Sequence, residues 1–415
     1  MDKKRIVVTG IGIVSCFGND VEVFYDTLLS GTSGVRLIDT FDVSEYPTKI
    51  AASIHGFEVG DYMDPKSARR MDRCIHYAMV AGKKAYKQAK LDEATLDLEK
   101  CGILIGSGMG GMHSFQEGVE VLKERGYRRL SPFFIPQIIT NMSGALLAID
   151  LEFMGPNYSV TTACATSSYA IVNAANHIRQ GHADVMICGG TEAAITSMGL
   201  TSFIANKALS RRNDAPEKAS RPWDKDRDGF VMGEGSAVLI LESLEHAQKR
   251  NAPILAEYRG GFLNSDAYHM THPREDGSGV AVCVEKALED SGVKKEEVNF
   301  VSAHATSTPA GDVPEILGLK SVFHEKLKAM KINAIKSMIG HTLGAAGAMG
   351  AISIIQAIQT GKIHPTINLD HVDDALLGYD FVPLKAQDYK VNVGLGNSFG
   401  FGGHNACILF QGFDA

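Results

Sequence analysis

The chain has 415 residues, 45% hydrophobic and 21% charged, which is ordinary globular usage for roughly two to three domain-sized units. Its formal net charge of −7 argues against nucleic acid as a partner. Seven cysteines without a Cys-x-x-Cys pair indicate free thiols in a reducing compartment. No run approaches the roughly 20 apolar residues of a membrane helix, so we expect a cytoplasmic protein without a membrane partner.

The first predicted element is a strand over 5–14, in which Gly10 and Gly12 interrupt the apolar run and argue against a signal peptide. A second apolar strand over 101–105 leads into glycines at 106, 108 and 111, the spacing of a dinucleotide-binding loop. Such a site also requires a strand that ends in an acidic residue about 20 residues later, and none follows. We therefore do not predict NAD binding.

Cys164 lies where an extended stretch of β-branched residues changes into a predicted helix, which has apolar residues at 170, 171, 174, 175 and 178. Free N–H groups and the dipole at a helix N-terminus favour a thiolate there. Taken alone, Cys164 is equally well explained as a buried structural cysteine, whose apolar neighbours would raise its pKa. A catalytic role therefore requires partners.

Residues 224–229 begin like a calcium-binding loop. The bidentate ligand of such a loop is a glutamate at the twelfth position, whereas Gly235 stands there and Glu234 falls one position early. We therefore predict a charged turn before a strand over 236–241, and no metal site.

Two histidines, His304 and His341, each follow an apolar strand-like run and lead into small residues, as at the edge of a sheet. Small neighbours would let a substrate approach closely, and Lys336 lies five positions before His341. The glycine-rich run over 394–405 is either a β-turn or a loop whose backbone N–H groups face a developing oxyanion.

Six separated blocks match one family in the same order: 162–167, 220–224, 228–235, 303–308, 336–341 and 397–403. The match runs from the opening strand at 5–10 to Phe410 and so covers nearly the whole chain. Through them the chain resembles the elongating β-ketoacyl-[acyl-carrier-protein] synthases, the bacterial synthase II and plastid synthase I group. The resemblance implies decarboxylative condensation of malonyl-acyl carrier protein with a Cys-bound acyl chain. The product is a 3-oxoacyl-acyl carrier protein two carbons longer, formed in fatty acid elongation without a cofactor other than the carrier's phosphopantetheine.

The resemblance also implies roles for single residues. Cys164 would take the acyl group as a thioester, while His304 and His341 would promote malonyl decarboxylation and stabilise the enolate. The backbone N–H groups of Cys164 and Phe401 would form an oxyanion hole.

Further residues would support these groups. Lys336 would organise the second histidine electrostatically, and Glu315 would pair with this lysine, with Asp312 as a second supporting carboxylate. Thr306 and Thr308 would bind the phosphopantetheine arm, unless their loop faces away from the cysteine.

The resemblance indicates pocket residues as well. Phe401 would also gate the acyl tunnel, Met109 would shape its depth, and Phe399 would contact substrate. Phe133 and Phe134 either reach the tunnel of a neighbouring subunit or pack in the core.

Docking of an acidic carrier protein to a net-negative chain requires a local basic patch. The candidates form two groups, each of which has a solvated helix face as its alternative. They are Lys66, Arg69 and Arg70, with Arg73 nearby, and Lys207, Arg211 and Arg212.

The fold that the resemblance implies is α/β, the duplicated five-layer αβαβα arrangement of thiolases, with the site where the halves meet. We predict an N-terminal half over 1–253 that carries Cys164, and a C-terminal half over 254–415 that carries His304, Lys336, His341 and the glycine-rich loop. Insertions around 60–75 and 110–140 are expected to cap the site and form a homodimer interface.

Two residues depart from the commoner bacterial pattern, and several other protein classes are alternatives to this prediction. Ala305 and His404 replace the commoner bacterial glycine and threonine, which leaves the substrate range open. A thiolase would carry a second cysteine in the late glycine-rich loop, an initiating synthase would have asparagine in place of His341, and a chain-length subunit would lack Cys164. A papain-like hydrolase would not explain Lys336. A stand-alone polyketide ketosynthase has the same residues and stays an open alternative.

Overall fold

The computed structural model describes residues 3–413 and contains one large mixed sheet. Its nine strands hydrogen bond in the order β4-β5-β6-β1-β7-β13-β12-β8-β9. In chain order they are β1 (Ile6–Val14), β4 (Cys101–Gly106), β5 (Val185–Glu192), β6 (Gly235–Ser243), β7 (Ala256–Ser265), β8 (Val298–Ser302), β9 (Lys331–Asn333), β12 (Val393–Gly400) and β13 (His404–Gln411). The strands expected over 5–14 and 236–241 are thus confirmed as β1 and β6.

The same strand pattern occurs twice in this sheet. In the first sub-sheet β1 is antiparallel to β6, β6 is antiparallel to β5, and β5 is parallel to β4. In the second, β7 is antiparallel to β13, β13 is antiparallel to β12, and β12 is parallel to β8. Among the described residues, the two sub-sheets join only where the start of β1 pairs with β7, from Ile6 opposite Tyr258 to Val8 opposite Ala256.

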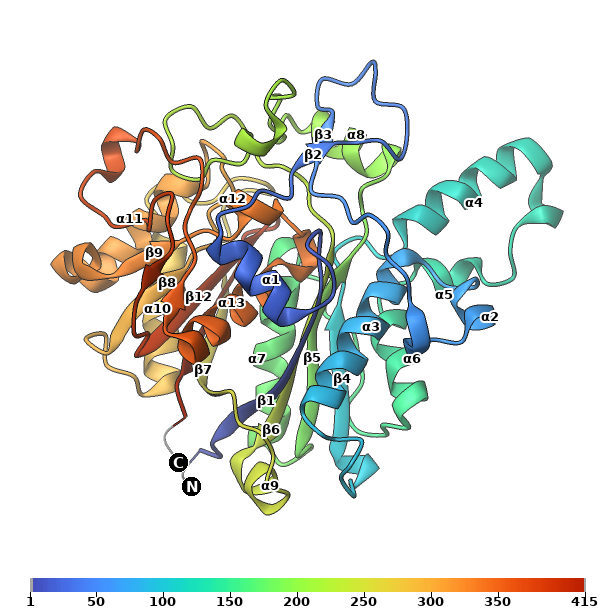
Figure 1. Cartoon of the computed structure of the whole chain (residues 1–415), viewed down its shortest axis with the longest axis horizontal. Helices are drawn as coiled ribbons and strands as arrows, with labels where there is room; N and C mark the ends of the chain where they lie inside the picture. Colours follow the sequence, from blue (N-terminus) through green and yellow to red (C-terminus); the bar gives the residue numbers. More distant parts are fainter. Residues whose placement is uncertain (1–2, 414–415) are drawn as a thin grey trace.

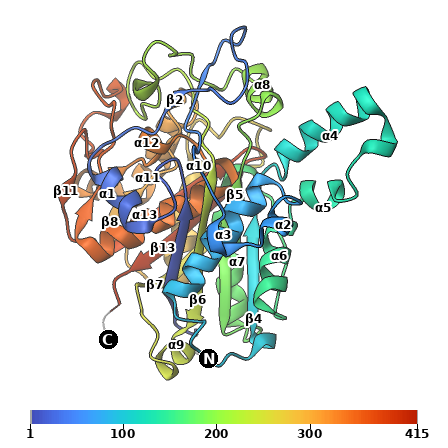
Figure 2. The same cartoon turned by 45° about the vertical axis from the view of Figure 1, so that its right-hand side comes forward.

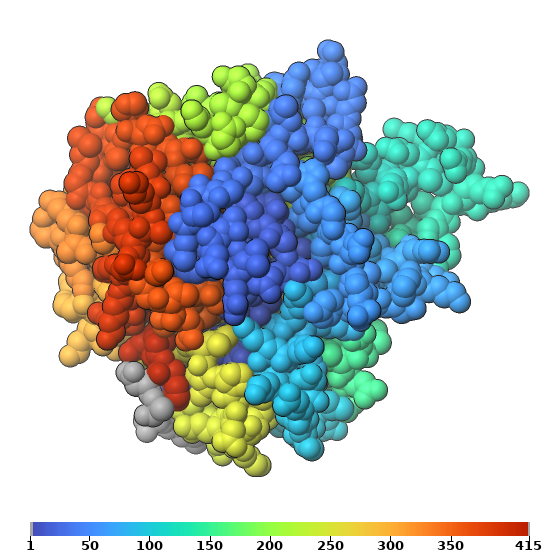
Figure 3. Space-filling model, in the orientation of Figure 1, coloured from blue at the N-terminus to red at the C-terminus, as the bar shows by residue number. Residues whose placement is uncertain are grey.

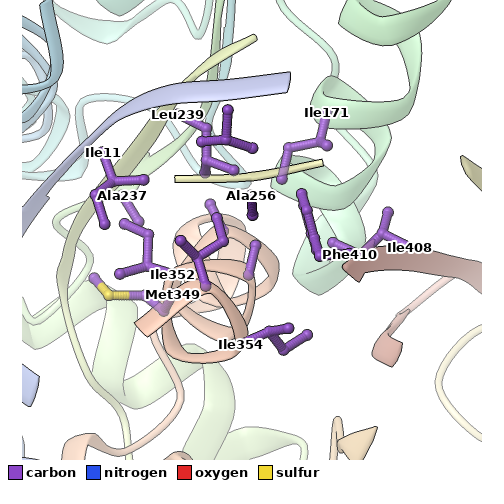
Figure 4. Packing of buried hydrophobic residues seen from close by; sticks show 14 of the residues in the cluster. Ile11, Ile171, Ala237, Leu239, Ala256, Met349, Ile352, Ile354, Ile408 and Phe410 are labelled. Atoms are coloured by element: carbon purple, nitrogen blue, oxygen red, sulfur yellow. The ribbon is translucent and has the colours of Figure 1, made fainter. Parts of the chain in front are cut away.

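Two central helices, α7 (Thr166–Arg179) and α13 (Ala346–Thr360), lie between the sub-sheets (Figure 1). They share one buried cluster with strands of both sub-sheets, and the residues labelled in Figure 4 come from all of these elements. Helices α3 (Arg73–Gln88) and α6 (Met142–Leu151) cover the outer face of the first sub-sheet. Helices α10 (Ser278–Ser291) and α11 (Asp312–Phe323) cover the outer face of the second. The predicted five-layer αβαβα fold is confirmed.

Small residues allow the central helices to pack closely. The N–H of Ala348 donates to Ser167 Oγ at 2.9 Å, and the hydroxyls of Ser168 and Ser398 are 2.8 Å apart. The window Leu343–Thr360 is long and apolar enough to cross a membrane, a feature that the sequence expectation overlooked, yet 72% of it is buried inside the protein. Its composition is therefore explained by its place in the central layer.

Helices α4 (Met112–Arg125) and α5 (Phe134–Ile138) form an arm that projects from the first half (Figures 1 and 2). The arm also stands out from the molecular surface (Figure 3). It leaves the sheet at the edge strand β4. The expectation that 60–75 and 110–140 cap the site and form a dimer interface stays a prediction, because neither segment borders the cavity that contains Cys164 within the single chain. Segments nearer the junction of the halves, around 203–208, 228–230, 266–273 and 304–315, border it instead.

The remaining elements are short or peripheral. They are α1 (Val21–Leu29), β2 (Arg36–Leu37), β3 (Ile50–Ala51), α2 (Pro65–Ala68), α8 (Ser197–Ala205), α9 (Leu244–Lys249), α12 (Lys336–Ile339), β10 (Lys362–Ile363) and β11 (Gln387–Asp388), together with short 3-10 helices.

Candidate active site

Cys164 lies in a single 3-10 turn, Ala163–Ala165, directly before α7. Ala163 has a left-handed φ of 49°, which costs a non-glycine residue on the order of 1–3 kcal/mol. Gly400, at the end of β12, approaches this turn so closely that a Cβ would lie 2.6 Å from the Thr162 carbonyl oxygen and 3.1 Å from Cys164 N. This approach brings the backbone N–H of Phe401 to the sulfur, beside that of Cys164 itself.

The Cys164 thiol is protonated at neutral pH. Burial raises its pKa to about 12, while the Lys336 charge and the N–H groups of Cys164 and Phe401 act in the opposite direction. The expected lowering of this pKa at a helix N-terminus was therefore wrong for the free protein. The physical reason is an apolar cluster around the sulfur, which includes Leu343 and Phe230.

The two histidines meet Cys164 in one cavity of about 330 Å³. His304 follows β8 and His341 follows α12, and their ring centroids are 5.3 Å apart. Burial and then the Lys336 charge hold the pKa of His304 well below its usual value, and the same causes act on His341. Both rings are therefore neutral near pH 7. The N–H of Leu343 donates to His341 Nδ1 at 3.3 Å, so His341 carries its proton on Nε2.

Lys336 and Glu315 do not form the direct pair that we expected. Glu315 accepts hydrogen bonds from the backbone N–H of His304 at 2.9 Å and Ala305 at 2.8 Å, and from Asn397 Nδ2 at 3.0 Å. Both residues lie in the described part of the chain, and no salt bridge within 4.0 Å joins them. The carboxylate already has three donors, and Lys336 acts on it at longer range. Burial lowers the Lys336 pKa to about 8.

Asp312 organises the loop after His304. Its Oδ1 accepts from the backbone N–H of Thr306 at 2.9 Å, Ser307 at 3.1 Å and Thr308 at 3.4 Å. The hydroxyls of Thr306 and Thr308 are 3.0 Å apart, and both residues border the cavity of Cys164. The loop thus faces the cysteine, and binding of phosphopantetheine by these threonines stays a prediction.

The aromatic candidates divide between the cavity and the arm. Phe399 and Phe401 border the cavity, and the Phe399 ring packs edge-on against His304 at 5.4 Å. Phe133 lies on the arm under the Arg70 guanidinium, 4.8 Å from it, and Phe134 stacks on Phe115. Met109 packs in the apolar cluster that contains Cys164 but does not border the cavity.

The two basic groups lie in different places. Lys66, Arg69 and Arg70 are exposed on and just after α2, beside the arm. Lys207 borders the cavity, with Arg211 and Arg212 close behind it in the chain.

Sequence reasoning missed Glu192, the fully buried last residue of β5. Its carboxylate accepts the N–H groups of Gly108 and Met109, so the glycine-rich loop after β4 is turned toward Glu192. A charged residue at the end of an otherwise apolar strand was the signal that could have revealed it. The calcium-like loop is likewise structural, because buried Asp224 accepts from Arg221 Nε at 2.9 Å. Within residues 3–413 no three His, Cys, Asp or Glu side chains converge as metal ligands.

A duplicated five-layer fold that places one cysteine and two histidines between its halves defines the ketosynthase class of thiolase-like proteins. Family models for the beta-ketoacyl synthase N-terminal domain and C-terminal domain match residues 3–247 and 255–370. The chain belongs to the beta-ketoacyl synthase family.

Named relatives and solved structures agree with this family. The chain is 58% identical to 3-oxoacyl-[acyl-carrier-protein] synthase I, chloroplastic, of Arabidopsis thaliana, over 99% of this chain and 87% of that one. It is 45% identical to 3-oxoacyl-[acyl-carrier-protein] synthase 2 of Vibrio cholerae, over 99% of this chain and all of that one. The structure of the ishigamide ketosynthase/chain length factor superposes with a TM-score of 0.93 at 34% identity, covering 100% of both chains. That of a type II polyketide ketosynthase in complex with its acyl-carrier protein (AntDE:AntF) gives 0.90 at 29% identity, again covering 100% of both.

Proposed function

We propose that this protein is a β-ketoacyl-[acyl-carrier-protein] synthase II, which elongates fatty acids by decarboxylative condensation. The observation that carries the proposal is the cavity in which the Cys164 thiol, two neutral imidazoles and the Phe401 N–H lie together. The relatives include a synthase I at 58% identity and a synthase 2 at 45% identity. Their names therefore leave open the length of the acyl group that this protein elongates.

The first half-reaction loads the enzyme. The Cys164 sulfur attacks the acyl thioester of the carrier protein, a new C–S bond forms, and the carrier thiol leaves with the cysteine's proton. The N–H groups of Cys164 and Phe401 would hold the alkoxide of the tetrahedral intermediate. They are backbone groups of the turn before α7 and of the loop after β12.

The second half-reaction extends the chain. The bond between the malonyl carboxylate and its α-carbon breaks, CO₂ leaves, and the electron pair forms an enolate whose oxygen would accept from His341 Nε2–H and from His304. The enolate carbon then attacks the Cys164 thioester. The C–S bond breaks, and the Cys164 thiolate takes up one proton from solvent, which balances the departure of the malonyl carboxylate as CO₂. Neutral imidazoles suit this step because they donate hydrogen bonds without adding a charge.

Carrier protein is the proposed partner. AntDE is a ketosynthase seen in complex with an acyl-carrier protein, and the relatives' names specify carrier-bound substrates. The exposed basic groups around Lys66 and Lys207 support docking of an acidic partner. No cofactor other than the carrier's phosphopantetheine is part of the proposal. Relatives named 3-oxoacyl-[acyl-carrier-protein] synthase are 58% and 45% identical to the chain, whereas the type II polyketide ketosynthase is 29% identical, so we prefer fatty acid elongation to polyketide synthesis.

We further propose a homodimer in the cytoplasm. Large apolar side chains on and near the arm are exposed, among them Tyr127 at 74%, Ile135 at 59% and Ile149 at 72%, which favours burial against a second copy. All seven cysteines are free, which supports a reducing compartment. We also propose that the boundary between the two halves lies between residues 253 and 254.

The test is intact-protein mass spectrometry of wild type and Cys164→Ser after incubation with hexanoyl-carrier protein and then malonyl-carrier protein. We expect only wild type to gain the acyl mass, and malonyl-carrier protein to remove it as a ketoacyl product two carbons longer. An adduct that forms from acyl-CoA alone, or no adduct at all, would contradict the proposal.

A further inference from the structure

Glu192 is a buried carboxylate that the proposed reaction does not use. Its side chain is 0% exposed, and four donors surround it. Oε1 accepts from Ser107 Oγ at 2.9 Å and Met109 N at 3.1 Å, while Oε2 accepts from Gly108 N at 2.8 Å and Gly344 N at 3.0 Å. Because four donors bind this buried carboxylate, the position of the Glu192 side chain is fixed.

These donors come from both halves of the fold. Ser107, Gly108 and Met109 follow β4 in the first half, whereas Gly344 lies in the turn before α13 in the second. The backbone at position 344 lies so close to these groups that there is no room for a side chain. A Cβ on Gly344 would lie 2.6 Å from Gly108 N and 2.7 Å from Glu192 Oε2. Glu192 is therefore a direct bridge between the halves, close to Cys164 and His341.

The turn that Glu192 holds also orients His341. Leu343, between His341 and Gly344, has a left-handed φ of 48°, a strained conformation for leucine that needs support from its neighbours. In that conformation its N–H points at His341 Nδ1, and the next N–H along the chain, of Gly344, points at Glu192. We infer that Glu192 is a positioning residue for the reaction, whose carboxylate fixes the turn at Leu343 and Gly344 and thereby the tautomer of His341.

The charge of Glu192 also reaches the nucleophile. Its negative charge raises the pKa of the Cys164 thiol, against the effect of Lys336. Burial raises the pKa of Glu192 itself to about 7, although its four hydrogen bonds lower it. Glu192 raises the pKa of this thiol and Lys336 lowers it, so removal of the Glu192 charge has a predictable sign: the thiol ionises at lower pH.

Two variants test the inference, which rests on the proposed function only for its kinetic readout. Glu192→Ala removes all four acceptor contacts, and Glu192→Gln keeps one acceptor oxygen but no charge. Glu242→Gln is the matched control, because Glu242 is also a fully buried glutamate of the first sub-sheet and bonds Thr9, His246 and Arg250 away from the site.

Three readouts apply. Nitrogen NMR of ¹⁵N-histidine-labelled protein should show His341 protonated on Nε2 in wild type, a mixture of tautomers in Glu192→Ala, and a smaller change in Glu192→Gln. The pH midpoint of Cys164 alkylation by iodoacetamide should fall in both variants. The kcat for malonyl-carrier decarboxylation should fall roughly ten-fold in Glu192→Ala with little change in KM, as expected for loss of one positioning hydrogen bond.

The control should change none of these readouts, even if it lowers Tm. An unchanged His341 tautomer with an unchanged alkylation midpoint would overturn the inference, and if Glu192→Ala does not fold, Glu192→Gln decides. The NMR and alkylation readouts need no turnover. Failure of wild type to decarboxylate would therefore count against the proposed function and leave the role of Glu192 to be judged separately.

Discussion

At the scale of single residues, burial controls the charge of the four side chains at the centre of the site. It holds both histidines neutral, raises the pKa of Cys164 to about 12 and lowers that of Lys336 to about 8. The charge of Lys336 lowers the pKa of the thiol, against the effect of burial.

Removal of this charge should make the thiol harder to ionise. We expect Lys336→Met to slow alkylation of Cys164 by iodoacetamide at pH 7.5 about ten-fold, which corresponds to a rise of one pKa unit. Lys336→Arg keeps a charge and should stay closer to wild type. In wild type the effect of Lys336 should fade as pH rises through about 8, because the lysine then loses its proton. Equal alkylation rates in wild type and Lys336→Met would contradict this prediction.

Different substitutions should block the two half-reactions. Cys164→Ala should abolish condensation but leave malonyl decarboxylation, because the two histidines that stabilise the enolate remain. His304→Ala should reduce decarboxylation by about a hundred-fold or more while acyl transfer to Cys164 continues. Release of labelled CO₂ and intact mass measure the two steps. Loss of acyl transfer in folded His304→Ala would show that this histidine also serves the first step.

At the scale of elements, the site depends on the end of β12 lying against the turn before α7. The Phe401 N–H reaches the sulfur only because Gly400 has no side chain. A similar fit between Gly344 and Gly108 holds the turn before α13. Both central helices therefore begin at tight backbone contacts with a neighbouring loop.

Gly400→Ala should test the first contact. Its Cβ would lie 2.6 Å from the Thr162 carbonyl oxygen, so the turn or the loop must move. We expect acyl transfer to fall at least about ten-fold, because misplacement of reacting groups is costly. The adduct rate by intact mass measures this. Gly412→Ala is the control, since its nearest neighbour, a side-chain atom of Ile358, is 3.6 Å away. An unchanged rate in folded Gly400→Ala would show that the contact is dispensable.

At the scale of the whole molecule, the surface carries two features that the site does not require. One is the apolar arm of α4 and α5, and the other is the pair of basic groups on an otherwise acidic chain. The first is suited to a second copy of the chain and the second to an acidic partner.

The arm predicts a dimer in solution. Light scattering should give twice the chain mass of 44.6 kDa. Ile135→Glu would place a charge in the proposed interface and should shift the mass toward the monomer, whereas Leu377→Glu, at an equally exposed apolar position in the other half, should not. A monomeric wild type would contradict the prediction.

The basic groups predict how carrier protein docks. Charge reversal of Lys66, Arg69 and Arg70, or of Lys207, Arg211 and Arg212, should raise KM for carrier-bound substrates but not for small thioesters. We expect the second group to have the larger effect because Lys207 borders the cavity. The KM difference should shrink at high salt. An unchanged KM in both variants would place docking elsewhere.

Local pattern and family motifs were sufficient to predict much of this protein. The periodic residues of α7, the strands β1 and β6, and the meeting of Cys164, His304 and His341 in one place were all predicted from the sequence. The helix and the strands depend on spacing along the chain, which the sequence displays directly. The meeting of the cysteine and the two histidines was implied by the resemblance to the family.

Tertiary structure alone decided the pKa of Cys164, the partners of Glu315, the direction of the α4–α5 arm and the bridge made by Glu192. Each depends on which groups surround a side chain after packing. Desolvation of the Cys164 sulfur comes from residues such as Phe230 and Leu343, which are distant in sequence. The four donors to Glu192 likewise come from residues 107–109 and 344, and no local pattern links them. Burial and hydrogen-bond partners are properties of the assembled layers, so only the folded chain determines them.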